Sequence, residues 1–214
     1  CNSRLFICLL MRNSSDNIFA LSTVRGKSAI AVFRISGKNL ERIFFKAFKN
    51  KKKQNNISTR QTLYYNKKIV DKVMAVYFKS PRSYTGEDVI EISTHGSPAV
   101  IKKTSETIIS LGARLAQPGE FTKRALLNNK INVIQAEGTL NLINSETDKQ
   151  REASIMQMDN ETNFFLKKIS LDLKKMLANV EAIIDFSDED LPKNIISKTK
   201  EQNKNIIMQI KKLI

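Results

Sequence analysis

The feature that most restricts the fold of this chain is a short segment in which a turn, a strand and a helix start follow one another directly. It covers residues 83–98 and has the sequence S-Y-T-G-E-D-V-I-E-I-S-T-H-G-S-P. Turn-forming residues begin the segment, apolar and polar residues alternate through its middle, and Gly-Ser-Pro ends it. This pattern is typical of a strand between a tight turn and a helix. The segment also carries ionisable side chains, so it is a candidate site as well as part of the scaffold: Glu87, Asp88, Glu91 and His95.

Short apolar runs bounded by Gly, Ser, Asn or Pro surround this segment and predict further strands. Pro98 suits the first turn of a helix, and Gly112 suits the left-handed residue just past its end. Residues 11–129 are therefore expected to form an α+β domain with a mixed or antiparallel sheet and two helices packed on one side. The lysine-rich tract at residues 49–58 is expected to be an exposed loop. The predicted strands are residues 18–22, 29–35, 61–65, 72–78, 89–94 and 113–116, and the predicted helices are residues 40–48 and 98–111.

Beyond residue 130 the apolar residues recur at steps of three and four, which is the spacing of an amphipathic helix. The pattern predicts one long helix over residues 155–184. Its apolar stripe needs a partner helix, at either residues 131–145 or residues 195–214. An acidic turn at residues 185–190 is expected to end it. We therefore predict that residues 130–214 form the first part of an α-helical domain with long amphipathic helices.

The start of the chain is expected to lie outside the folded part. The sequence does not begin with methionine, so we expect Met11 to be the true start and residues 1–10 to be a non-native extension. Both cysteines, Cys1 and Cys8, precede the first predicted element, which excludes a disulfide framework and fits a reducing, cytoplasmic setting. The longest apolar run, residues 5–11, is far shorter than the roughly 18 to 20 residues of a membrane helix.

The composition allows a core and leaves the partner open. With 214 residues, of which 41% are hydrophobic, the chain can bury a core without metals or disulfides. Its net charge of +15 would indicate a polyanionic partner such as RNA if the basic residues were clustered. They are spread instead over predicted loops and helix faces. The charge therefore fits a solvated surface as well as an RNA footprint.

Two charged residues are predicted to lie on strands among apolar neighbours. Arg34 shares a strand face with Ile30 and Val32, so it needs an anionic partner, either a ligand or a carboxylate. From spacing alone, a buried structural ion pair is the simpler prediction. Glu91 could form two parallel hydrogen bonds to an N–H and an amino group, the pattern that a pterin ring presents. Alternatively, Glu91 pairs with Arg34 or Lys130.

Other ionisable residues have more ordinary predicted roles. His95, the only histidine, could be a general base, but we predict a turn residue hydrogen-bonded to backbone. Glu87 and Asp88 follow a glycine and are predicted to serve the turn and to remain solvated. Lys130 follows Asn-Asn at the junction of the two regions, where it could meet a ligand carboxylate or remain solvated. Glu120 is predicted to lie at a helix start, where it suits the helix dipole.

Several sequence blocks occur in the order found in one protein family. They are F-R-I-S-G, S-Y-T-G-E-D-V-I-E-I, H-G-S-P, L-G-A-R-L-A-Q-P-G-E-F-T-K-R-A-L-L-N-N-K, Q-A-E-G and V-E-A-I-I-D-F. Over residues 17–192 they resemble the MnmE (TrmE) family of tRNA modification GTPases. The resemblance implies an amino-terminal domain similar to folate-binding aminomethyltransferases, which binds a tetrahydrofolate derivative (5,10-methylene- or 5-formyl-tetrahydrofolate) and forms a homodimer. A helical domain follows, into which a GTPase domain is inserted.

The resemblance also implies roles for individual residues. The family's folate contacts include an arginine, a glutamate and a lysine, which fall here on Arg34, Glu91 and Lys130. Glu91 would then read the edge of the pterin ring, while Arg34 and Lys130 would neutralise acidic parts of the cofactor. The resemblance implies no catalytic residue and no metal ligand within these residues.

The reaction implied by the resemblance builds an aminomethyl-type group on the wobble uridine of certain tRNAs. A folate supplies one carbon, the partner protein MnmG supplies a flavin, and a GTPase domain hydrolyses GTP with Mg²⁺ and K⁺. The sequence contains no phosphate-binding loop of the form G-x-x-x-x-G-K-[ST]. We therefore expect a chain truncated before the GTPase domain, which binds folate and self-associates but does not hydrolyse GTP or modify tRNA alone. The alternatives are a stand-alone folate-binding aminomethyltransferase-like protein and a basic RNA-binding module.

Two short stretches depart from the family pattern. A turn rich in proline and glycine is replaced here by V-R-G-K-S, and H-G-G-P is replaced by H-G-S-P, with Ser97 at the third position. If the family glycine has a positive φ, the serine would be strained there.

Overall fold

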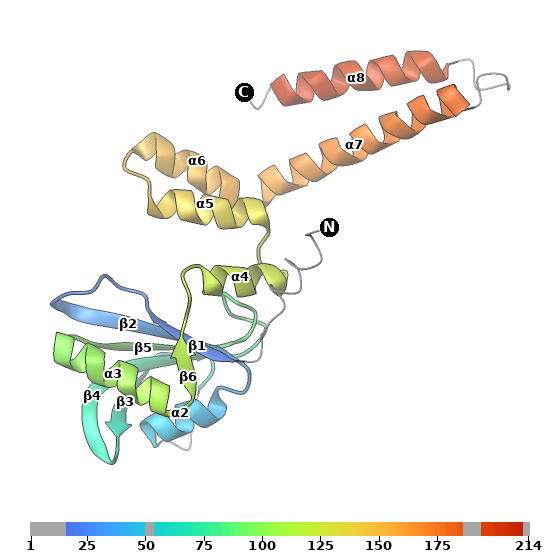
Figure 1. Ribbon diagram of the computed structural model, residues 1–214. Coiled ribbons are helices and arrows are strands. Elements are labelled where there is room, and N and C mark those ends of the chain that lie inside the picture. The colour runs from blue at the N-terminus through green and yellow to red at the C-terminus, as the bar shows by residue number, and fades with distance from the viewer. Residues whose placement is uncertain (1–15, 50–53, 186–193, 212–214) are drawn as a thin grey trace. The chain divides into compact units, whose positions relative to one another are not determined.

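The computed structural model describes three ranges of the chain: residues 16–49, 54–185 and 194–211 (Figure 1). The predicted extension at residues 1–10 and most of the predicted acidic turn at residues 185–190 lie outside these ranges. Contacts between residues divide the chain into two compact units, Cys1–Asn132 and Val133–Ile214. Among the described residues, no helix is long and apolar enough to cross a membrane.

A six-stranded sheet forms the centre of the first unit. The strands are β1 (Asn17–Leu21), β2 (Ser28–Gly37), β3 (Thr59–Tyr65), β4 (Lys68–Phe78), β5 (Asp88–Gly96) and β6 (Ala113–Leu115). They lie in the order β3-β4-β5-β2-β1-β6. Neighbouring strands are antiparallel, except that β6 is parallel to β1. The predicted α+β class with a mixed sheet is therefore confirmed.

The hairpin between β3 and β4 is tighter than predicted, because β4 begins at Lys68 rather than at residue 72. Asn66 and Lys67 connect the two strands, and their φ angles are +47° and +64°. Two positive φ angles are typical of the primed two-residue turns that match the twist of a hairpin. The usual sequence signal for such a turn has glycine at its second position. Lysine stands there instead, so the turn was not predicted.

Two helices cover one face of the sheet and form the hydrophobic core with it. They are α2 (Glu41–Phe48) and α3 (Pro98–Ser110) (Figure 1). Phe44 of α2 lies in the core, with its ring centroid 4.9 Å from that of Phe48 and 5.9 Å from that of Tyr77. Burial of each such side chain contributes roughly 1.5–3 kcal/mol. This contribution determines which residues of the alternating strands face inward.

Both ends of α3 follow the sequence prediction. Pro98 occupies the first turn, and the Oγ atom of Ser97 accepts a hydrogen bond from the backbone N–H of Val100 at 3.2 Å. Ser97 has a φ of −84°, so the strain of a positive φ does not arise there, and its hydroxyl stabilises the helix start. Gly112 follows the end of the helix with a φ of +95°.

The opposite face of the sheet carries exposed residues. Ile30 and Arg34 of β2 and Met74 of β4 are exposed there, and buried residues alternate with them along each strand. The helix α4 (Glu120–Leu127) lies on this side of the sheet (Figure 1). One end of the open face is thus covered by α4, and the functional residues predicted on β2 and β5 lie beside this helix.

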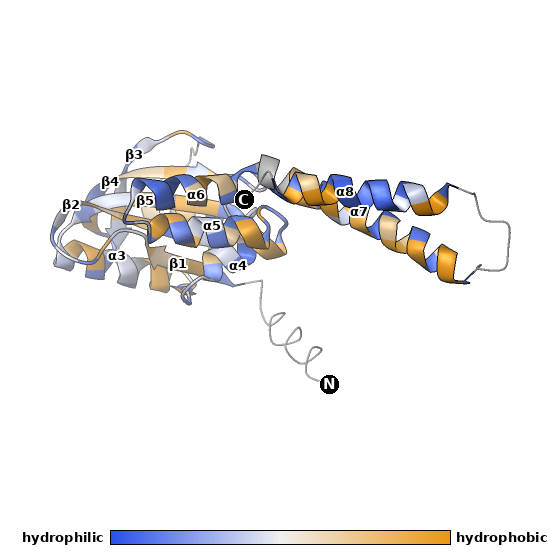
Figure 2. Ribbon diagram, turned by 90° about the horizontal axis from the view of Figure 1, so that it is seen from above, coloured by the Kyte–Doolittle hydropathy of each residue, from blue (hydrophilic) through white to orange (hydrophobic). Residues whose placement is uncertain are grey.

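The second unit consists of helices, namely α5 (Val133–Ile143), α6 (Asp148–Met158), α7 (Asn160–Asp185) and α8 (Ile195–Lys211). α5 packs on α6, and α7 packs on α8. The second pairing is one of the two that the sequence predicted for the long helix. Ile169 of α7 and Ile206 of α8 are buried. Figure 2 shows that apolar and polar residues lie along both helices, as expected of amphipathic helices.

The prediction of one helix over residues 155–184 is wrong at its amino-terminal end. Asp159 has a φ of −72° and a ψ of 145°, an extended conformation that ends α6, and α7 begins at Asn160. The side chains of Asp and Asn bond to nearby backbone groups and favour helix ends over helix interiors. The break was missed because the apolar spacing continues across it.

Candidate functional site

The three residues predicted to contact a cofactor line one pocket of the first unit. Arg34 comes from β2, Glu91 from β5 and Lys130 from the segment after α4. The pocket has a volume of about 410 Å³. Its other lining residues are Phe78, Arg82, Ser83, Tyr84, Val89 and Phe121. The walls therefore combine cations, one carboxylate and aromatic rings.

Arg34 and Glu91 form an ion pair across the pocket wall. They lie directly opposite each other on the paired strands β2 and β5, and the Nε–H of Arg34 donates to Oε1 of Glu91 at 2.6 Å. Their side chains are 49% and 28% exposed. The prediction of an ion pair at Arg34 is thus confirmed, but the prediction that it is buried is wrong. An exposed pair contributes little, up to about 1 kcal/mol, so a ligand could rearrange it at small cost.

Lys130 reaches the pocket because the chain reverses after α4. Asn128 is the C-cap residue of the helix, and Asn129 has a φ of +54°. The backbone N–H of Lys130 then donates to the carbonyl oxygen of Ala125 at 2.9 Å. The Nδ2 atom of Asn128 donates to the carbonyl oxygen of Thr85 at 2.7 Å. These bonds hold the segment that carries Lys130 against the loop before β5.

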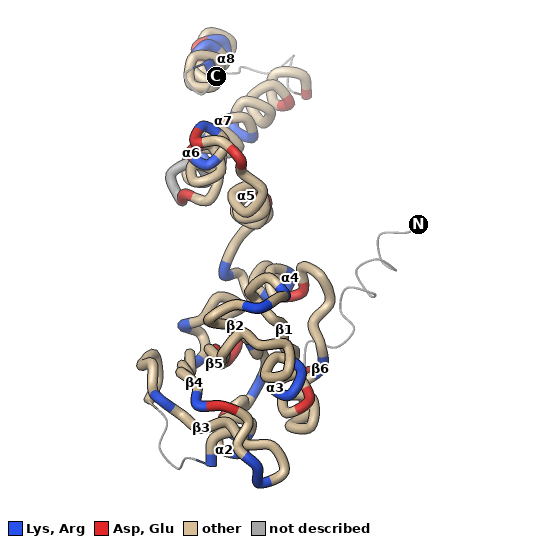
Figure 3. The backbone as a smooth tube through the Cα atoms, turned by 90° about the vertical axis from the view of Figure 1, so that its left-hand side faces the viewer, with Lys and Arg blue, Asp and Glu red and all other residues tan. Residues whose placement is uncertain are grey.

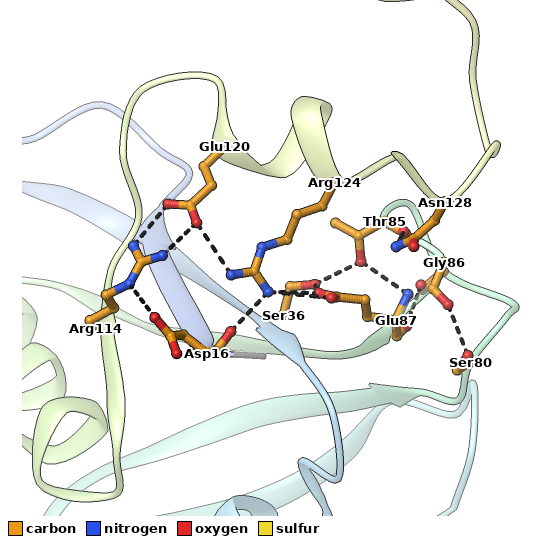
Figure 4. Close-up of polar contacts among 11 residues, drawn as sticks. Asp16, Ser36, Ser80, Thr85, Gly86, Glu87, Arg114, Glu120, Arg124 and Asn128 are labelled. Atoms are coloured by element: carbon orange, nitrogen blue, oxygen red, sulfur yellow. Dashed lines mark hydrogen bonds and ion pairs between the residues drawn. The ribbon is translucent and has the colours of Figure 1, made fainter. Parts of the chain in front are cut away.

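A buried ion pair lies beneath the same loop and was not predicted. Arg124 Nη1 donates to Glu87 Oε2 at 3.0 Å, and the two side chains are 4% and 7% exposed (Figure 4). The hydroxyl of Ser36 donates to the same carboxylate at 2.8 Å, and Ser36 Oγ lies 2.7 Å from Thr85 Oγ1. Arg124 Nη1 also donates to the backbone carbonyl of Asp16 at 2.8 Å. The prediction that Glu87 serves a solvated turn is therefore wrong.

Asp88, the neighbour of Glu87, is also buried rather than solvated. It accepts hydrogen bonds from the hydroxyl of Tyr77 at 2.7 Å and from the backbone N–H of Ser80 at 3.0 Å. Burial, followed by the hydrogen bond to Asp88, raises the pKa of Tyr77. The tyrosine therefore keeps its proton, and its bond to Asp88, above the pH at which an exposed tyrosine would ionise. The residue spacing within the turn could not predict the burial of Asp88, because its hydrogen-bond partners belong to β4 and to the segment after β4.

The buried pair continues through Glu120 of α4 to a second arginine, Arg114 of β6 (Figure 4). Glu120 is the first residue of the helix, as predicted. Arg114 binds its two oxygens through Nη1 at 2.9 Å and Nη2 at 2.7 Å, and Arg124 Nη2 reaches Oε1 at 3.2 Å. The hydrogen bond from Arg114 is the main cause that lowers the pKa of Glu120 to about 2. The spacing of four residues between Glu120 and Arg124 could have indicated their pairing.

His95 does not belong to the pocket, and its predicted role as a turn residue bonded to backbone is wrong. It lies on β5, where its Nδ1 is 2.8 Å from Oδ1 of Asp71. Its backbone N–H donates to the other oxygen of the same carboxylate at 2.8 Å. The histidine thus joins β5 to β4 at the surface. Within the described residues, no group of three or more His, Cys, Asp or Glu could hold a metal ion.

Two family models match this chain one after the other. The model described as the GTP-binding protein TrmE N-terminus matches residues 17–130, and the model of the MnmE helical domain matches residues 133–214. Their order along one chain does not favour a stand-alone aminomethyltransferase-like protein or a basic RNA-binding module.

Curated relatives agree with these matches. The chain is 38% identical over 201 residues to the tRNA modification GTPase MnmE of Aquifex aeolicus, and the aligned region covers 93% of the chain and 43% of the relative. It is 44% identical over 186 residues to the protein of the same name from Rickettsia conorii, covering 86% of the chain and 42% of the relative. The chain therefore spans less than half the length of these relatives. By its sequence blocks, its fold and these matches, it belongs to the MnmE (TrmE) family of tRNA modification GTPases.

Proposed function

We propose that residues 11–129 form a domain that binds a tetrahydrofolate derivative and self-associates, and that residues 130–214 form the first part of a helical domain. The observation that supports this proposal is the meeting of Arg34, Glu91 and Lys130 at one pocket. They come from two strands and a segment after a helix, so their proximity is a property of the fold and not of local sequence.

The chemistry of the pocket suits a flat, polar ring with an acidic tail. The carboxylate of Glu91 can accept two parallel hydrogen bonds from the N–H and amino groups of a pterin ring. Phe78, Tyr84 and Phe121 offer aromatic surfaces beside it. Arg34 and Lys130 would neutralise the acidic parts of the cofactor, which is either 5,10-methylene- or 5-formyl-tetrahydrofolate in this proposal.

Because Glu91 is already paired with Arg34, a ligand that binds Glu91 would have to break this ion pair. The pair uses one hydrogen bond, from Nε of Arg34 to Oε1 of Glu91, and not the two of a bidentate pair. A ring that takes over Glu91 would release the guanidinium of Arg34, which could then bind an anionic group of the same ligand. The pair would thus keep the two groups in place until the ligand arrives.

For the whole protein, the proposal is cytoplasmic modification of tRNA wobble uridine with GTP hydrolysis, which rests on the family resemblance and on the relatives being named tRNA modification GTPases. In that reaction the folate site supplies one carbon, MnmG is the flavin-containing partner and tRNA is the substrate. GTP, Mg²⁺ and K⁺ would be bound by a GTPase domain, and we assign no contact with them to the residues of this chain.

Titration calorimetry of the full chain with 5-formyltetrahydrofolate tests the folate site. Glu91→Ala is expected to weaken binding by about tenfold or more, because a hydrogen bond to a charged group contributes about 1.5–3 kcal/mol. Glu106→Ala is the matched control, since it removes the same charge from an exposed carboxylate paired with Lys103 on α3. Equal binding by wild type and Glu91→Ala would remove Glu91 from the site, and no binding by the wild type would reject the proposal.

Self-association is tested separately, by sedimentation velocity of the full chain over a range of concentrations. The proposal expects a homodimer formed through the first unit. A sedimentation coefficient that stays at the monomer value at every concentration contradicts this part of the proposal. The folate site is tested independently by the calorimetry.

A further inference from the structure

We propose that Gly86 is a positioning residue for Lys130: because it has no side chain, the stem of the lysine can lie across the loop before β5 and bring the ammonium group to the pocket. The identity of the ligand in this inference rests on the proposed function. The placement of the lysine does not.

The space above Gly86 is filled by the segment that carries Lys130. A Cβ atom added to Gly86 would lie 2.9 Å from Cγ and 3.2 Å from Cδ of Lys130, and 3.1 Å from Cβ of Asn128. Two non-bonded carbon atoms are optimally about 3.5–4.0 Å apart. The Cγ and Cβ atoms lie close to the backbone, so a rotation at the far end of the lysine cannot relieve this contact.

Neither side of the contact is free to move. Gly86 lies between Thr85, which is fully buried, and Glu87, which is bonded to Arg124. Its own carbonyl oxygen accepts a hydrogen bond from Ser80 Oγ at 2.8 Å. Gly86 also has a φ of +77°, which glycine adopts without the strain of a side chain.

The lysine segment is held just as firmly. Asn128 is bonded to Thr85, the residue before Gly86, and the backbone N–H of Lys130 is bonded to Ala125 of α4. Because α4 is itself held to the loop by the buried pair of Arg124 and Glu87, the two sides cannot separate as rigid bodies. An added methyl group must therefore displace the side chain of Lys130, and with it the cationic wall of the pocket.

The test compares Gly86→Ala with Gly112→Ala in the full chain, each with Lys130 intact and with Lys130→Ala. Gly112 is the matched control, because its φ of +95° is also in the left-handed region but an added Cβ would meet nothing within 4 Å. The first measurement needs no folate: acetylation of lysines by N-hydroxysuccinimidyl acetate, followed by peptide mass spectrometry. Lys102, exposed on α3, is the internal reference.

Gly86→Ala is expected to change the acetylation rate of Lys130 relative to Lys102 by at least about twofold, because the displaced side chain gains rotamer freedom. Gly112→Ala is expected to leave this ratio unchanged. If Gly86→Ala alone does not fold, folding of the double variant with Lys130→Ala supports the inference, since shortening the lysine removes the closest atoms. An unchanged acetylation ratio in folded Gly86→Ala, or unfolding in both backgrounds, overturns it.

The second measurement is the affinity for 5-formyltetrahydrofolate. Gly86→Ala is expected to weaken binding by about tenfold when Lys130 is present and by less than about twofold in the Lys130→Ala background, because the two changes remove the same interaction. Equal weakening in both backgrounds would mean that Gly86 does not act through Lys130. If the wild type binds no folate, the proposed function fails, and the acetylation rates still decide the placement of Lys130.

Discussion

Two Arg–Glu pairs in the sheet unit have the same chemistry and different surroundings. The pair of Arg34 and Glu91 lies on the open face of the sheet, and one hydrogen bond joins it. The pair of Arg124 and Glu87 is buried where α4 meets the loop before β5, and Ser36 also donates to the carboxylate there. What distinguishes them is whether a helix covers the sheet at that position.

The comparison indicates which charges build the scaffold and which remain available to a ligand. A buried pair is stabilising only when its remaining polar atoms are satisfied, and breaking it leaves an uncompensated charge. An exposed pair is already partly hydrated, so exchanging one partner for a ligand costs little. The buried pair fixes α4 and the loop before β5, and this arrangement in turn sets the walls of the pocket that contains the exposed pair.

The largest predicted effect is the loss of stability on breaking the buried pair. Arg124→Met should lower the free energy of unfolding by about 3–5 kcal/mol, because Glu87 is left buried without its cation. Arg34→Met should lower it by at most about 1 kcal/mol. The measurement is urea unfolding followed by tyrosine fluorescence. The chain has no tryptophan and its tyrosines all lie in the first unit, so the signal reports on that unit alone.

A double variant sharpens this prediction. Replacing both members of the buried pair, Arg124→Met with Glu87→Met, should recover part of the stability that Arg124→Met loses, because no charge is left buried. If Arg34→Met and Arg124→Met lose the same free energy, the distinction between the two pairs is wrong.

An intermediate effect is expected from acid, through Glu120. Its pKa is about 2 in the folded chain and 4.5 when unperturbed, so its stabilising effect is fully present above about pH 4.5 and is lost as the pH falls toward 2. We expect a loss of about 1–3 kcal/mol over that range, since each pKa unit corresponds to about 1.4 kcal/mol and part of this is screened. The comparison is Glu120→Gln, which has no carboxylate to titrate.

Unfolding in urea at a series of pH values checks this expectation. The wild type should be more stable than Glu120→Gln near neutral pH, and the two should approach each other near pH 2. A difference that stays constant with pH would mean that the contacts of Glu120 with Arg114 and Arg124 do not depend on its charge.

The alternating strands and helix ends of the first unit could be predicted from the sequence because their signals are local. Alternation along β5 predicts that Glu91 and its apolar neighbours face opposite sides, and Pro98 and Gly112 mark the ends of α3. The turn at Asn66 and Lys67 and the break at Asp159 were missed. At the turn, lysine stands where the usual signal has glycine, and at Asp159 the apolar spacing of a helix continues across the break despite the preference of Asp and Asn for helix ends.

The candidate site was predictable only in part. Arg34, Glu91 and Lys130 were found through sequence blocks shared with a family, and the fold brings them to one pocket. The buried pair could not be found in this way, because Arg124 and Glu87 meet only when α4 lies on the sheet. A glutamate after a turn glycine normally indicates solvent exposure, and here the tertiary structure reverses this preference.

The smallest expected effect on stability is also the most informative about function. A double-mutant cycle with Arg34→Met and Glu91→Gln should give a coupling of about 0.2–1 kcal/mol in urea unfolding, the range of exposed ion pairs. The same variants should weaken binding of 5-formyltetrahydrofolate by much larger factors if the pair exists to hold two ligand-binding groups in place. A coupling well above this range, together with unchanged ligand binding, would identify the pair as part of the scaffold. Arg34 and Glu91 would then be equivalent to Arg124 and Glu87 despite their exposure.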